Sequence, residues 1–84
     1  MKVELHPAMV RAFEEARAAG NRGEVPVGAC ITGPDGTIVA SAGNRTRELN
    51  DPTAHAEVLV IREAGRQLAS ERLTGYDLHV TLEP

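Results

Sequence analysis

The chain has 84 residues, of which 42% are hydrophobic and 25% charged, a globular composition with room for one domain at most. The formal net charge of −3 excludes a global attraction to phosphate, and the single cysteine, Cys30, excludes an intramolecular disulfide. No stretch approaches the roughly 18 apolar residues of a membrane span, and no secretory signal pattern opens the sequence. We therefore expect a soluble, cytoplasmic protein.

The first half of the sequence predicts a helix followed by a β-hairpin. Residues 7–19 are rich in Ala, Glu and Arg, with apolar residues at helical spacing, and Gly20 follows as the expected C-terminal stop. Two apolar runs, at residues 27–32 and 37–42, flank the turn-forming residues 33–36. This pattern is typical of two antiparallel strands.

The second half predicts a polar loop, a second helix and a third strand. Residues 43–52 are polar, and residues 54–68 carry strong helix formers with one apolar face, preceded by Thr53 as the N-cap. Residues 78–82 have strand composition. The order α-β-β-α-β predicts an α/β fold in which a crossover connection packs helices against one sheet. Because no helix follows the last strand, we expect part of one sheet face to be uncovered.

The densest group of potentially reactive side chains opens the second helix, in the tripeptide His55-Ala56-Glu57. A neutral imidazole can ligate zinc, and a carboxylate can move protons to and from an activated water. Residues two apart point to roughly opposite sides of a helix, so His55 and Glu57 suit two different roles better than one shared ion. Taken alone, the tripeptide is more typical of an exposed histidine beside a carboxylate at a helix N-terminus.

Four sequence blocks give this tripeptide its context. They are Glu-Val-Pro-Val-Gly-Ala at residues 24–29, Gly-Asn-Arg at 43–45, Asp-Pro-Thr-Ala-His-Ala-Glu at 51–57 and Val-Thr-Leu-Glu-Pro at 80–84. The last block begins the Pro-Cys-x-x-Cys half of the nucleobase deaminase signature. Over nearly the whole chain, the blocks resemble the bacterial tRNA-specific adenosine deaminases of the cytidine deaminase superfamily. The resemblance implies a three-layer α-β-α cytidine deaminase-like fold, incomplete here, with residues 1–84 as the N-terminal part of a single deaminase domain.

The resemblance also implies site residues and a reaction. His55 matches the zinc ligand and Glu57 the proton shuttle. The backbone amide of Ala56 and the side chain of Asn44 match groups that hold the base, and Val27 matches a pocket wall. The implied reaction is the zinc-dependent hydrolytic deamination of adenosine to inosine in tRNA, carried out by a homodimer in the full-length family. A free-base or nucleoside deaminase acting on cytosine or guanine is the alternative within the superfamily.

Residues around Asn44 can also be interpreted from their chemistry alone. The Asn44 amide offers a donor and an acceptor to the edge of a base, whereas a turn asparagine beside Gly43 is an equally good interpretation. Arg45 and Arg47 lie in the same loop, where they are candidates for contacts with RNA phosphates.

The sequence departs from the family in its metal ligands. The family's Cys-x-x-Cys follows the proline that matches Pro84 and is not present, while His6 and His79 are expected at a helix cap and on a strand face. One histidine cannot hold catalytic zinc, which normally takes three protein ligands. We therefore expect an incomplete zinc site that a complementing C-terminal fragment restores. The alternative is an inactive truncated or split piece of the enzyme.

Overall fold

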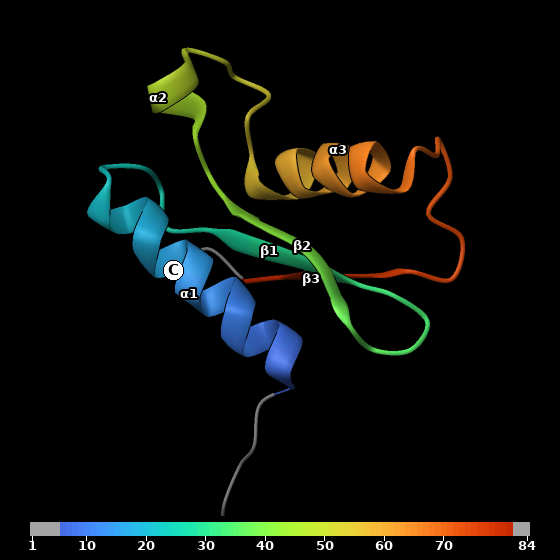
Figure 1. The fold of residues 1–84 in the computed structure, drawn as a ribbon. Helices are drawn as coiled ribbons and strands as arrows, with labels where there is room; N and C mark the ends of the chain where they lie inside the picture. The colour runs from blue at the N-terminus through green and yellow to red at the C-terminus, as the bar shows by residue number, and fades with distance from the viewer. Residues whose placement is uncertain (1–5, 82–84) are drawn as a thin grey trace, which may run out of the picture.

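The structure is a computed structural model, and it describes residues 6–81 (Figure 1). Along the chain its helices and strands are α1 (Pro7–Asn21), β1 (Gly28–Thr32), β2 (Ile38–Gly43), α2 (Thr46–Leu49), α3 (Ala56–Leu68) and β3 (Asp77–Val80). None of the helices in these described residues is long and apolar enough to cross a membrane.

A three-stranded sheet lies between two helices. Its strand order is β2-β1-β3, and β1 runs antiparallel to both neighbours, so β2 and β3 run parallel to each other. Helix α1 covers one face of the sheet and α3 covers the other (Figure 1). The three-layer α-β-α fold and the predicted order of its main elements are therefore confirmed, with α2 as one added short helix.

Strand β1 is buried along its whole length because helices cover both of its faces. Ile31 packs with Val60 of α3, whereas Cys30 beside it packs with Ala12 of α1. Alternate residues of a strand point to opposite faces, which explains why this strand is a continuous apolar run in the sequence. Leu78 of β3, the register partner of Ile31, is 45% exposed, so the sheet face under α3 is partly uncovered, as predicted.

Helix α1 approaches the sheet closely because all of its buried residues are alanines. These residues are Ala8, Ala12, Ala16 and Ala19. A Cβ atom added at Gly28 of β1 would lie 1.9 Å from the carbonyl oxygen of Ala12 and 2.6 Å from the amide nitrogen of Ala16. The backbone of the helix thus packs directly on the backbone of the strand, and position 28 has room only for glycine.

The structure shifts the predicted bounds of all five elements by one or two residues. Strand β1 begins at Gly28 and not at residue 27, β2 spans Ile38–Gly43 and not 37–42, and α3 begins at Ala56 and not at residue 54. Helix α1 continues past the predicted stop at Gly20 to Asn21, and the left-handed conformation falls on Gly23, with φ of 88°. The predicted loop at residues 43–52 contains the one-turn helix α2. The third strand, Asp77–Val80, begins one residue earlier than predicted, and its predicted end lies outside the described residues.

The close contact at Gly28 predicts a strongly destabilised Gly28→Ala variant. The added methyl group meets backbone atoms of α1, which can yield only if the helix moves away from the sheet. We expect the free energy of unfolding in urea to fall by about 3 kcal/mol. In the matched variant Gly20→Ala the nearest atom is Pro26 Cβ at 3.3 Å, and the change should stay below about 1 kcal/mol. Equal losses in the two variants would contradict this explanation.

Candidate active site

Asn44 lies where strand β2 ends, and its side chain binds the start of α3. Its Oδ1 accepts a hydrogen bond from the Ala56 amide at 2.8 Å, and its own backbone amide donates to the Val27 carbonyl at 3.1 Å. All three residues are buried, with exposed fractions of 3% for Asn44 and 0% for Ala56. The Asn44 side chain thus satisfies one of the amides that the start of a helix leaves without a partner.

His55 and Glu57 flank Ala56, so the hydrogen bond that the Ala56 amide donates to Asn44 helps to fix both of them. His55 is the N-cap residue of α3, with an extended backbone (φ −77°, ψ 153°) and an exposed side chain that makes no capping hydrogen bond. Glu57 is half-buried in the first turn of α3, where the helix dipole favours a negative charge. The five residues expected at the site therefore lie together around the start of α3, with Val27 bonded to Asn44.

A tight turn before α3 leads into His55. The Asp51 carboxylate accepts hydrogen bonds from the Thr53 hydroxyl at 2.7 Å and the Thr53 amide at 2.8 Å. The buried Ala54 accepts a hydrogen bond from the Arg45 amide at 2.9 Å, which joins the two ends of the loop. The prediction of Thr53 as the N-cap is wrong, because α3 begins only at Ala56 and its N-cap residue is therefore His55, while Thr53 lies within the turn. The Thr53 hydroxyl, followed by the Thr53 amide, holds the pKa of Asp51 below its ordinary value.

His55 is one potential metal ligand, and the described part of the chain does not complete a site around it. Residues 6–81 contain no group of three or more His, Cys, Asp or Glu side chains that could hold a metal ion. His6 and His79 lie at the expected cap and strand positions, where their rings stack with centroids 5.3 Å apart. Because catalytic zinc takes three protein ligands, the described residues alone do not fit this ion.

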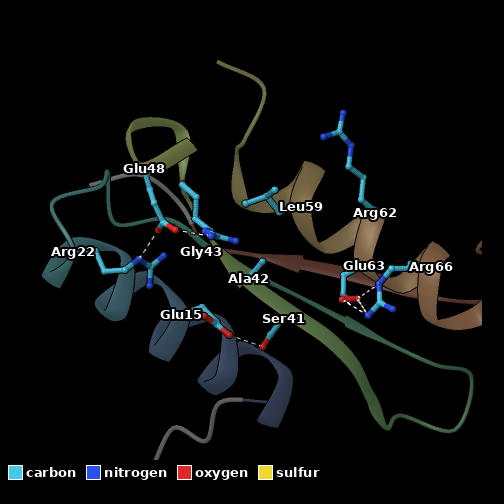
Figure 2. A pocket seen from close by; sticks show the side chains of 11 residues that line it. Glu15, Arg22, Ser41, Ala42, Gly43, Glu48, Leu59, Arg62, Glu63 and Arg66 are labelled. Atoms are coloured by element: carbon cyan, nitrogen blue, oxygen red, sulfur yellow. Dashed lines mark hydrogen bonds and ion pairs between the residues drawn. The ribbon is translucent and has the colours of Figure 1, made fainter. Parts of the chain in front are cut away.

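A groove of ≈ 590 Å³ lies beside strand β2, between α1, α2 and α3 (Figure 2). Three of its four arginines pair with carboxylates, Arg22 and Arg45 with Glu48 and Arg66 with Glu63, whereas Arg62 forms no ion pair within residues 6–81. The Arg45–Glu48 hydrogen bond raises the pKa of Arg45 and lowers that of Glu48. None of the five expected site residues lines this groove. Three glutamates stand against the four arginines that line the groove, so little net positive charge is left to attract a phosphate.

The sequence pattern assigns no role to Glu24, yet the structure buries this residue against the loop that follows Asn44. Its exposed fraction is 6%, and its two oxygens accept the backbone amides of Arg47 at 3.1 Å and Glu48 at 2.8 Å. The Arg47 guanidinium, a candidate for phosphate contact, donates to the Gly23 carbonyl at 3.0 Å. In the sequence, Glu24 is the charged first residue of the block 24–29, and this pattern does not identify partners 23 and 24 residues away.

A three-layer α/β region in which a His-x-Glu tripeptide opens the helix over the sheet defines the class, because zinc-dependent nucleobase deaminases carry this signature. The family model described as the cytidine and deoxycytidylate deaminase zinc-binding region matches residues 3–84, and the chain belongs to this family.

Relatives within the family extend well beyond the matched region. The tRNA-specific adenosine deaminase of Agrobacterium fabrum is 60% identical over 76 residues, which cover 90% of this chain and 49% of that protein. A structure solved in a study of A-to-I editing by tRNA:A34 deaminases at the wobble position of transfer RNA superposes with a TM-score of 0.86 at 60% identity, over 92% of this chain and 58% of that one. The guanine deaminase of Bacillus subtilis gives a TM-score of 0.84 at 37% identity, over 98% of this chain and 52% of that one. The chain thus spans about half the length of the curated relatives it matches.

The turn before α3 predicts a specific pKa change in the variant Thr53→Val. Without the Thr53 hydroxyl the pKa of Asp51 should rise toward its ordinary value, as followed by NMR titration of the carboxyl carbon. In the native chain the lowered pKa of Asp51 stabilises the fold at pH values above the ordinary pKa of an aspartate. This stabilisation is lost as the pH falls through the pKa of Asp51 in the folded state. Asp35 and Thr37 repeat the arrangement, so Asp35 is the internal control and should not respond. An unchanged Asp51 pKa would show that the hydroxyl contact is not its cause.

The Asn44–Ala56 hydrogen bond predicts a different stability for two substitutions at Asn44. Asn44→Ala leaves the fully buried Ala56 amide without a partner, which should cost about 1–3 kcal/mol in urea unfolding. Asn44→Asp retains an acceptor at a helix N-terminus and should cost clearly less. Asn21→Ala, at an exposed position, is the control and should change stability by less than about 0.5 kcal/mol. Equal costs for the alanine and aspartate variants at position 44 would contradict a stabilising role for this bond.

Proposed function

We propose that the chain is the N-terminal part of a single deaminase domain, which hydrolyses adenosine to inosine in tRNA when its C-terminal part is present. The observation that carries the proposal is the Asn44–Ala56 hydrogen bond, because it places an amide that can bind a base beside the two residues that the chemistry needs. The 60% identity to the A. fabrum enzyme supports tRNA as the substrate. A tRNA substrate also favours action in the cytoplasm.

The proposed roles follow from what the reaction requires. Deamination replaces the amino group of adenine with oxygen from water and releases ammonia. When bound by three protein ligands, zinc would lower the pKa of a water and so supply a nucleophile near neutral pH. We assign His55 as one of these ligands. We assign Glu57 as the carboxylate that accepts a proton from the water and delivers one to the leaving amine.

Asn44, Ala56 and Val27 are proposed to border the base. The Asn44 NH₂ group makes no hydrogen bond within residues 6–81, so it remains available to an acceptor on the base edge. Its oxygen holds the Ala56 amide, which keeps both groups at the same end of α3. Val27 is buried beside Asn44 and supplies an apolar wall. The site thus combines one apolar contact with a few fixed polar groups, as small-molecule sites generally do.

The remaining zinc ligands are proposed to come from a complementing C-terminal fragment that carries the family's Cys-x-x-Cys. Thiolates are strong zinc ligands, and their binding is coupled to folding. The same fragment would cover the exposed part of the sheet around Leu78. The resemblance to the family further suggests that the completed protein works as a homodimer.

The likeness to the B. subtilis guanine deaminase, at 37% identity, favours one second candidate, a free-base or nucleoside deaminase. The two candidates differ in substrate and share the proposed roles of His55 and Glu57. Assays with guanine, cytidine and an anticodon stem-loop RNA separate them directly.

The proposed function predicts that zinc and activity appear together in a completed protein. We define the completed protein as residues 1–84 joined to the segment of the A. fabrum enzyme that follows its matched region. It should bind about one zinc ion per chain and convert adenosine to inosine in the stem-loop RNA, whereas the 84-residue chain should do neither because it lacks two ligands. Zinc is measured by atomic emission, and inosine by chromatography of the digested RNA.

Two variants test the assignment of the proton shuttle in the completed protein. Glu57→Ala should lower kcat by at least about 100-fold at unchanged zinc content. Glu63→Ala removes a carboxylate from the same helix, away from its start, and should retain activity. A fully active Glu57→Ala variant contradicts the shuttle assignment, and zinc with turnover from the 84-residue chain contradicts the need for a complementing fragment.

A further inference from the structure

The segment between α1 and β1 holds the loop after β2 through three consecutive residues. The Arg22 guanidinium donates to the Asn44 carbonyl at 3.2 Å, and the Gly23 carbonyl accepts from the Arg47 guanidinium at 3.0 Å. Glu24 then accepts the two backbone amides in α2 with its carboxylate. We call residues 22–24 the loop clamp. It contacts this loop at Asn44 and at α2.

Glu24 is the buried residue of this loop clamp. Arg45, the N-cap residue of α2, makes no side-chain capping hydrogen bond, so the amides of Arg47 and Glu48 depend on a partner from elsewhere. The Glu24 carboxylate supplies one oxygen to each amide, 3.1 and 2.8 Å away. A carboxylate at a helix start is favoured by the partial positive charge of the amides, and charge-assisted hydrogen bonds are stronger than neutral ones.

Burying a charge costs free energy unless hydrogen-bond partners compensate for it. The partners of the buried Glu24 therefore show which part of the structure its carboxylate stabilises. Both hydrogen bonds of its carboxylate go to loop amides, and neither goes to the core of the sheet. The Glu24 amide is itself anchored to the Ala19 carbonyl at 3.0 Å, at the end of α1. Glu24 therefore connects a rigid helix end to the loop that carries Asn44.

We propose that Glu24 is a positioning residue: by capping α2 it holds the loop so that Asn44 stays bonded to the Ala56 amide beside His55 and Glu57. The consequence for catalysis rests on the proposed function. The geometric part does not, since it concerns one hydrogen bond between Asn44 Oδ1 and the Ala56 amide. That bond can be followed directly, because the Ala56 amide exchanges with solvent only when it opens.

The test compares Glu24→Gln with Glu71→Gln in the completed protein. Glu24→Gln keeps the size of the side chain but turns an NH₂ group toward one of the two loop amides, whereas Glu71 is an exposed carboxylate far from the loop clamp. In Glu24→Gln we expect hydrogen exchange of the Ala56 amide to speed up by about tenfold or more, with kcat/KM for the stem-loop RNA falling by a similar factor. Zinc content should not change. Glu71→Gln should alter neither quantity by more than about twofold.

A double-mutant cycle with Asn44→Ala separates positioning from a general loss of stability. If Glu24 acts through Asn44, adding Glu24→Gln to Asn44→Ala should lower kcat/KM little further. Additive losses, or an unchanged Ala56 exchange rate in Glu24→Gln, overturn the proposal. Should Glu24→Gln fail to fold, Glu24→Asp carries the same comparison. If the unmutated completed protein has no deaminase activity, the proposed function fails while the exchange rates still decide the role of Glu24.

Discussion

The contact between α1 and β1 at Gly28 sets the geometry on which the candidate site depends. Backbone atoms of Ala12 and Ala16 lie so near position 28 that the helix has a single position over the sheet. The end of the helix is therefore fixed as well, and residues 22–24 leave it at a defined point. From there, hydrogen bonds lead to the loop after β2 and through Asn44 to the start of α3. The start of α3, and with it His55, is thus connected by hydrogen bonds to the packing on the opposite face of the sheet.

The site is organised by acceptor side chains that bind backbone amides at the starts of helices. Glu24 does this for α2 and Asn44 does it for α3, each across a long stretch of sequence. Such contacts hold the backbone of His55 and Glu57 without using their side chains. An exposed imidazole and a half-buried carboxylate remain available for ligand or proton. Rigid support with unoccupied reactive groups is what an active site requires.

Sequence periodicity predicted the large elements because each has a clear physical signature. Strand β1 was predictable because both of its faces are buried, which makes it a continuous apolar run. Helix α3 was predictable because its apolar residues recur at helical spacing. The resemblance to the deaminases identified the five site residues, which the structure places together, and their roles stay predictions. Helix α2 was not predictable, because four residues are too few to show a periodicity and their capping group is Glu24, more distant than any local pattern reaches. The cap at His55 was missed because the turn formed by Asp51 and Thr53 delays the start of α3 to Ala56.

The sequence alone does not show that residues 22–24 support the loop that contains Asn44. Its residues precede β1, whereas the loop they hold follows β2, so the hairpin between them brings both to one end of the sheet. Register between β1 and β2 pairs Gly28 with Gly43, immediately before Asn44. The pairing of β1 with β2 therefore brings residues 22–24 close to Asn44.

The glycine and alanine packing between α1 and the sheet also restricts how this surface can diverge. In an ordinary core, a larger side chain on one element can be offset by a smaller one on its neighbour. At Gly28 the neighbouring atoms are a carbonyl oxygen and an amide nitrogen, which every amino acid carries. No second substitution in α1 can remove these atoms, so a larger residue at position 28 cannot be compensated by a smaller one in the helix. Sequence change on α1 is therefore directed to its outer face, where Val10 and Phe13 are already exposed.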